Sequence, residues 1–188
     1  GIPGTLNFFL ADSENGAGLD PSTAASIAGS VAAMYWLLML CGRFISSFIS
    51  GKVSSRMQLG VTSATAIVLV LCAMFTTQVQ ITMPVLKGFS EGFAMMSLPL
   101  SALLLILCGL CTSVMWGTIF NLSVEGLGKY SALASGLFMT MVVGGGVLPL
   151  IQNAIADSVS YMASYWVIVA ALAYILWFAV LGSKVKKA

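Results

Sequence analysis

Residues 103–149 read LLLILCGLCTSVMWGTIFNLSVEGLGKYSALASGLFMTMVVGGGVLP, and this stretch decides the fold class. Two long apolar runs flank a short polar segment, residues 123–131, which holds one Glu, one Lys and two Gly. A helix needs about 20 apolar residues to cross the hydrocarbon core of a bilayer. The stretch therefore predicts two membrane-spanning helices joined by a polar hairpin.

The helix after this hairpin carries small residues at every fourth position: Ala132, Gly136, Thr140 and Gly144. Small residues at this spacing form a smooth stripe, which lets a neighbouring backbone approach closely inside a bilayer. Gly144, Gly145 and Gly146 follow one another, with Pro149 just beyond. We expect these glycines to provide a tight packing point or a bend.

The segment MWGTIFNLSVEGLGKYSALASG, followed by GGGVLP and IADS, resembles the sugar permeases of the major facilitator superfamily. The similarity is to the fucose permease and glucose/galactose transporter group, in the region of helices 10 and 11. It extends over nearly all 188 residues. The resemblance implies an all-α membrane protein with the C-terminal six-helix half of the major facilitator fold, its first helix truncated, and an inverted three-plus-three helix repeat.

The composition independently indicates a membrane protein. Apolar residues make up 59% of the chain and charged residues 7%, against about 25% charged in soluble domains. The chain has no histidine, which excludes metal sites built on imidazole and acid–base catalysis by histidine. Cys108 and Cys111 form a C-x-x-C pair inside an expected span, where packing is favoured over redox chemistry. We expect no enzyme activity, no catalytic residue, no cofactor, no metal site and no nucleic-acid partner.

The remaining spans follow from the apolar runs and their polar borders. We expect a single transmembrane domain over residues 1–188, with a partial span at 1–11 and full spans at 22–49, 58–77, 98–120, 130–151 and 162–182. Residues 78–98 contain Pro84, Lys87 and Glu91, and are interpreted as an external loop with a short interfacial helix; their role is undefined. Residues 153–161 are interpreted as a second external loop.

The charges are sorted between the two sides of the membrane that these spans define. Seven bases fall on one side: Arg43, Lys52, Arg56, Lys129, Lys184, Lys186 and Lys187. Lys87 falls on the other side, together with five of the six acids, Asp12, Glu14, Asp20, Glu91 and Asp157. An excess of Lys and Arg marks cytoplasmic loops. The sequence therefore predicts a multi-pass protein of the cell inner membrane with a cytoplasmic C-terminus.

A partly basic segment, residues 42–56, resembles the signature loop of the superfamily, here between helices 8 and 9. It begins with Gly42 and Arg43 but lacks an acid and some of the arginines of the signature. The alternative is a basic stop at the cytoplasmic face with no special role. We assign Gly42, Arg43, Gly136, Gly144, Gly145 and Gly146 to helix packing and gating.

Sugar recognition requires amide or hydroxyl groups and an aromatic face. The candidate substrate-binding residues are Trp116, Asn7, Tyr35, Trp36 and Asn121, with Gln152 as a weaker candidate. The resemblance places Trp116 at an aromatic position beside the substrate cavity, although simple packing is the alternative for each residue. Asn121 also suits a helix end at the hairpin.

The expected function is secondary active transport, sugar:proton symport by alternating access. The expected partners are a small-molecule sugar, the proton, the lipid bilayer and the missing N-terminal half of the same polypeptide. No carboxylate lies centrally within a span, so a proton relay cannot be built from this chain alone. The alternatives are a major facilitator permease for another small solute and a non-transporting membrane assembly subunit. The sequence does not define the sugar, the coupling, the stoichiometry or the oligomeric state.

Overall fold

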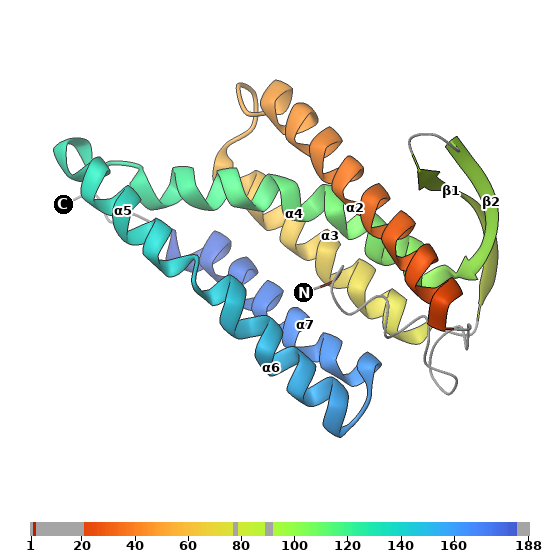
Figure 1. The fold of residues 1–188 in the computed structure, drawn as a ribbon. Coiled ribbons are helices and arrows are strands. Elements are labelled where there is room, and N and C mark those ends of the chain that lie inside the picture. Colours follow the sequence, from red (N-terminus) through yellow and green to blue (C-terminus); the bar gives the residue numbers. More distant parts are fainter. Residues whose placement is uncertain (1, 3–20, 77–78, 89–91, 184–188) are drawn as a thin grey trace.

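The computed structural model describes residues 2, 21–76, 79–88 and 92–183, and these form a bundle of long helices (Figure 1). The helices, in order, are α2 (Pro21–Ile49), α3 (Ser55–Phe75), α4 (Leu100–Val124), α5 (Ser131–Met141), α6 (Gly144–Ser158) and α7 (Tyr161–Trp177). A π-helical turn, Phe178–Gly182, continues α7. The prediction of a helical membrane fold is confirmed.

Five helical segments in the described part of the chain are long and apolar enough to cross a membrane: 25–49, 55–75, 100–124, 128–158 and 163–182. Large apolar side chains are exposed along them, as Phe48 and Phe75 illustrate at 82% and 81% exposure. In water such a surface would be costly, at roughly 25 cal/mol per Å² of apolar area. A lipid environment removes that cost.

Helix α4 lies at the centre of the bundle, packed against both α2 and α3. Helix α3 packs in turn on α7, and α7 on α6. Two glycines permit the close crossing of α2 and α4. A Cβ atom on Gly109 would lie 2.8 Å from the carbonyl oxygen of Tyr35, and one on Gly42 would collide with the Ser113 hydroxyl and lie 2.9 Å from the Leu110 carbonyl oxygen. Gly42 of α2 and Gly109 of α4 therefore allow the two backbones to come into close contact.

Many serine and threonine hydroxyls inside the spans donate hydrogen bonds to their own helices, although the buried Ser101 hydroxyl of α4 has no hydrogen-bond partner. Ser63 Oγ lies 2.7 Å from the Leu59 carbonyl oxygen, and Thr118 Oγ1 lies 2.9 Å from that of Val114. A hydroxyl bonded three or four residues back leaves no polar group unsatisfied in an apolar environment. These residues are therefore compatible with membrane helices.

Residues 80–99 differ from the sequence interpretation. They form an antiparallel hairpin of β1 (Gln80–Gly88) and β2 (Gly92–Pro99), rather than a loop with an interfacial helix. The prolines explain part of the difference, because each removes a backbone donor that a helix would need. Pro84 and Pro99 are compatible with a two-stranded ribbon, in which each strand has a free edge. Strand β1 packs on α2.

The fifth span also differs from its predicted limits. The α-helical pattern is interrupted at Val142 and Val143, between α5 and α6 and directly before the three glycines, although both residues keep helical backbone dihedrals. Helix α6 then continues through Pro149 to Ser158, and residues 153–158 are helical rather than an external loop. No glycine or proline follows Pro149 before Ser158, so nothing interrupts the helix. Ser160 caps α7, its Oγ accepting from the Ala163 N–H at 3.0 Å.

The polar hairpin after α4 is present as predicted. Gly126 and Gly128 have φ of +78° and +50°, a conformation that side chains other than glycine disfavour. A 3₁₀ turn, Gly128–Tyr130, then leads into α5. The expected partial span at 1–11 lies outside the described residues, apart from the buried Ile2.

Candidate substrate face

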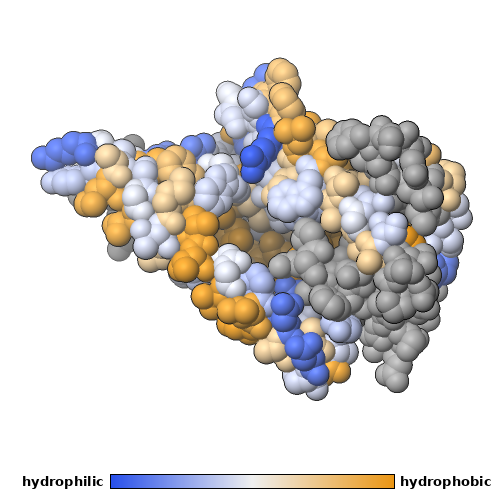
Figure 2. All heavy atoms as spheres, in the orientation of Figure 1, coloured by the Kyte–Doolittle hydropathy of each residue, from blue (hydrophilic) through white to orange (hydrophobic). Residues whose placement is uncertain are grey.

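The face of the molecule seen in Figure 1 is hollowed between α2 and the long arm formed by α5 and α6. Figure 2 shows apolar residues on the floor of this hollow and on the arm. The arm adjoins the bundle only at its edge, where α5 meets α4 and α6 meets α7. No residue in the most apolar 18-residue window of 128–158 is buried. The arm is therefore exposed along its length in the described chain.

Tyr35 and Thr112 join α2 to α4 at the crossing of these helices. Tyr35 is 7% exposed, and its hydroxyl lies 3.0 Å from Thr112 Oγ1. The adjacent Trp36 is 59% exposed, and the two rings meet edge to face at 5.8 Å. Of the two, Trp36 has the accessible ring, whereas the polar atom of Tyr35 is engaged within the bundle.

Trp116 lies one helical turn beyond Thr112 on the same face of α4. Its ring meets Phe138 of α5 edge to face at 5.3 Å, and Phe120 meets the same Phe138 at 5.4 Å. The Trp116 side chain nevertheless remains 43% exposed. An indole that packs on one aromatic neighbour and stays partly exposed offers both a flat apolar surface and an N–H donor.

Asn121 lies apart from this aromatic cluster, near the end of α4. It is exposed and lines a polar recess of about 1020 Å³ together with Arg56, Glu125 and Ser183. Its backbone carbonyl oxygen accepts the Glu125 N–H at 3.0 Å, which closes the last turn of α4. The structure thus places Asn121 at the helix end, while Asn7 lies outside the described residues.

The glycines assigned to packing fall into two groups. Gly42 lies against α4, and the neighbouring Arg43 is exposed. A Cβ atom on Gly136, Gly144, Gly145 or Gly146 would meet nothing within 4 Å in the described structure. The small-residue stripe of α5 and α6 therefore has no neighbour among the described residues, and its packing role stays a prediction.

Gln152, the weaker substrate-binding candidate, is 2% exposed and lines a cavity of about 280 Å³ between α6 and α7. Sequence reasoning missed two other features of this region. The Phe138 ring that packs on Trp116 was hidden among the other apolar residues of its helix. Arg56 donates from Nε to Ser183 Oγ at 2.8 Å, linking residues 127 positions apart. An arginine at the first turn of an apolar helix was the available signal for the last of these.

The described residues hold few groups for acid–base chemistry. Their acids are Glu125 and Asp157, each exposed and each at a helix end. No cluster of three or more potential metal ligands is found in the described residues.

Comparison with known proteins adds sequence and fold relatives. The chain is 30% identical over 168 residues to a glucose/galactose transporter of Brucella abortus, a match that covers 88% of this chain and 36% of the relative. It is 30% identical over 155 residues to a protein of Helicobacter pylori described as a putative glucose/galactose transporter, covering 80% and 33%. The chain thus spans about a third of the length of these relatives. No protein-family model matches it.

The fold has a solved counterpart. A crystal structure of a major facilitator superfamily transporter, FucP, in the outward conformation, matches with a TM-score of 0.73 at 17% sequence identity. The match covers 98% of this chain and 38% of that transporter. These similarities are to transporters rather than enzymes, and with the five apolar helices they identify a multi-pass membrane protein.

Proposed function

We propose, on the premise that this chain has the fold of one part of a major facilitator superfamily transporter and resembles glucose/galactose transporters, that it is the C-terminal half of a sugar transporter. The observation that carries the proposal is the coincidence of the two similarities over most of the chain. In this proposal the transporter works by alternating access, its two halves rocking around a site between them.

The open face is the surface that we assign to the N-terminal half and the sugar. Trp36 of α2 and Trp116 of α4 are exposed, and their rings offer the flat surface on which a sugar ring packs. The small-residue stripe that includes Gly136 and Gly144, where an added Cβ atom would meet nothing within 4 Å, would receive a helix of the other half. Both features suit a half-transporter.

Proton coupling in this proposal depends on residues of the other half. The described spans carry no acid away from their ends, and an ionisable group within the membrane is the usual element of a proton relay. Symport therefore needs a carboxylate from the N-terminal half, placed near the sugar. The 188 residues contribute substrate contacts and the moving scaffold.

The orientation of the protein follows from its charges. Arg43, Lys52, Arg56 and Lys129 lie toward the end of the bundle where α2 and α4 finish and α3 and α5 begin. Asp157 and the β1–β2 hairpin lie at the opposite end of the bundle. We assign the basic end to the cytoplasm of a cell inner membrane. Lys184, Lys186 and Lys187, which lie outside the described residues, would be on the same side, and Glu14 on the other.

Single cysteines should report this orientation. In a cysteine-free, full-length version, Leu127→Cys should react with an impermeant maleimide only after the membrane is opened. Asp157→Cys should react in intact cells, because the spans between these positions place them on opposite sides. Labelling of position 127 in intact cells would overturn the assigned orientation.

Replacing Trp116 should weaken sugar binding before it affects folding. The purified full-length protein should bind glucose or galactose saturably, and Trp116→Ala should lower the affinity about tenfold, or about 1.4 kcal/mol. The melting temperature should fall no further than in Trp177→Ala, which removes a similarly exposed tryptophan. Trp116→Phe should retain part of the affinity, because it keeps a flat ring.

The matched control is Trp177→Ala, a similarly exposed tryptophan at the last residue of α7. It should leave sugar affinity unchanged. If Trp116→Ala instead melts early while the folded fraction binds sugar normally, the residue is structural. If the folded wild-type protein binds neither sugar, the substrate proposal is wrong.

A further inference from the structure

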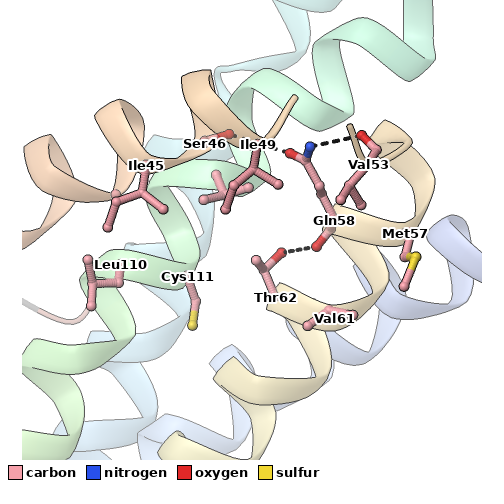
Figure 3. A pocket seen from close by; sticks show the side chains of 12 residues that line it. Ile45, Ser46, Ile49, Val53, Met57, Gln58, Val61, Thr62, Leu110 and Cys111 are labelled. Carbon is pink, nitrogen blue, oxygen red and sulfur yellow. Dashed lines mark hydrogen bonds between the residues drawn. The ribbon is translucent and has the colours of Figure 1, made fainter. Parts of the chain in front are cut away.

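An apolar groove of about 320 Å³ lies between α2, α3 and α4, away from the aromatic cluster (Figure 3). It is lined by Ile45, Ile49, Met57, Val61, Leu110 and Val114. Four of these side chains are 40–62% exposed, so the groove opens onto the outer surface of the helices. On a membrane protein, a groove of this kind offers an acyl chain contact with apolar side chains over most of its surface.

The polar atoms at the groove are already paired. Gln58 donates from its amide to the Val53 carbonyl oxygen at 3.0 Å, and its amide oxygen accepts from Ser46 at 3.4 Å (Figure 3). Thr62 donates to the Gln58 carbonyl oxygen at 2.8 Å. A polar guest would find these groups engaged with each other. The groove therefore favours a hydrocarbon occupant.

The groove adjoins the polar recess at the basic end of the bundle, because Val53 lines both. The recess is about 1020 Å³ and has serine hydroxyls around one cation and one anion: Ser50, Ser54, Ser55, Ser183, Arg56 and Glu125. An apolar groove beside a polar recess at the end of the membrane helices matches a lipid molecule, in which apolar chains are attached to a polar head group.

The two charges define the head group that fits. Arg56 uses Nε to bind Ser183, which fixes the guanidinium and leaves four N–H donors on its terminal nitrogens. A guanidinium in a fixed position suits a phosphate, to which it can donate two parallel hydrogen bonds. Glu125 accepts hydrogen bonds from an ammonium group and repels an additional anion. Together they fit a head group with one phosphate and one amine.

We propose that this groove and recess form a binding site for a phospholipid of the surrounding bilayer that carries a phosphate and a primary ammonium. One acyl chain lies in the groove, the phosphate binds Arg56, and the ammonium donates to Glu125. A quaternary ammonium has no N–H to donate, so a choline head group loses the second contact. The site depends on the membrane placement of the helices and is independent of the transported substrate.

The test is lipid occupancy of the delipidated full-length protein, measured by native mass spectrometry. Ethanolamine, choline and glycerol phospholipids with identical acyl chains are titrated separately. The ethanolamine lipid should bind about tenfold more tightly than the choline lipid, since a hydrogen bond to a charged group contributes on the order of tenfold or more. Equal binding of ethanolamine and choline lipids, or tighter binding of the anionic glycerol lipid, would overturn the proposal.

Substitutions separate the two head-group contacts. Arg56→Gln should lower the affinity for the ethanolamine lipid about tenfold. Glu125→Gln should bring that affinity down to the value for the choline lipid. Lys87→Gln, which removes a cation from the hairpin at the opposite end of the bundle, should change neither value. An unchanged preference in folded Glu125→Gln would contradict the ammonium contact.

The groove has its own matched pair. Val61→Trp places a large ring into the groove and should reduce binding of every phospholipid. Val68→Trp is the control, because Val68 lies two turns further along the same face of α3 at nearly the same exposure, 59% against 57%, and does not line the groove. Both variants keep an apolar residue on the membrane surface. Equal lipid affinity in the two variants would show that no acyl chain uses the groove.

Discussion

Gly109→Leu should destabilise the protein by about 3 kcal/mol, the upper part of the range for overpacked interiors. A Cβ atom at this position lies 2.8 Å from the Tyr35 carbonyl oxygen and 3.1 Å from its ring. The first of these neighbours is backbone, which cannot rotate away as a side chain would. Helices α2 and α4 must separate, and the hydrogen bond between Tyr35 and Thr112 is then lost as well.

The measurement is the free energy of unfolding in mixed micelles, followed by helical circular dichroism as denaturant is added. The control is Gly117→Leu on the same helix, where a Cβ atom meets nothing within 4 Å. That variant should change the free energy of unfolding by less than about 0.5 kcal/mol, as surface substitutions usually do. Equal losses in the two variants would show that α2 and α4 do not cross at Gly109.

The spans were predictable because a bilayer imposes a strong constraint on sequence. Long apolar runs with charges at their borders predict helices whatever their tertiary contacts, as α2 and α4 show. Helix ends that are set by a turn in the backbone, rather than by charged residues, were harder to predict. The polar residues 153–158 resemble a loop in composition, yet they continue α6 as a helix.

The β1–β2 hairpin is a structure that the hydrophobic periodicity of the sequence alone does not determine. Residues 80–99 are too short and too polar for a span, and their periodicity does not distinguish a loop from a two-stranded ribbon. Pairing such as that of Met83 with Met96 depends on contacts between residues well separated in the sequence. Strand β1 also packs on α2, a contact that no local pattern predicts.

The glycines show the same limit for the site. Gly42 and Gly136 were both assigned to helix packing, but Gly42 lies against α4, whereas a Cβ atom added to Gly136 would meet nothing within 4 Å in the described chain. Spacing identifies a face suited to close packing and says nothing of which helix will cover it. Trp116 was identified through family resemblance, whereas its ring partner Phe138 depends on the fold.

The dependence of transport on a second half has the largest functional consequence. The 188 residues reconstituted alone should show no sugar accumulation, because the hollow face remains open and the described spans hold no central acid to carry a proton. Joined to the proposed N-terminal half, the same residues should support uptake. The loss is expected to be complete, since half of the substrate site is removed.

The most direct measurement is accumulation of radiolabelled galactose and glucose in proteoliposomes under an inward proton gradient, with the full-length protein and the 188-residue chain assayed side by side. We expect accumulation by the full-length protein that a protonophore abolishes, and only the background of protein-free vesicles for the chain alone. Proton-driven accumulation by the 188 residues alone, or the absence of uptake by the folded full-length protein, would contradict the proposal of a half-transporter for sugars.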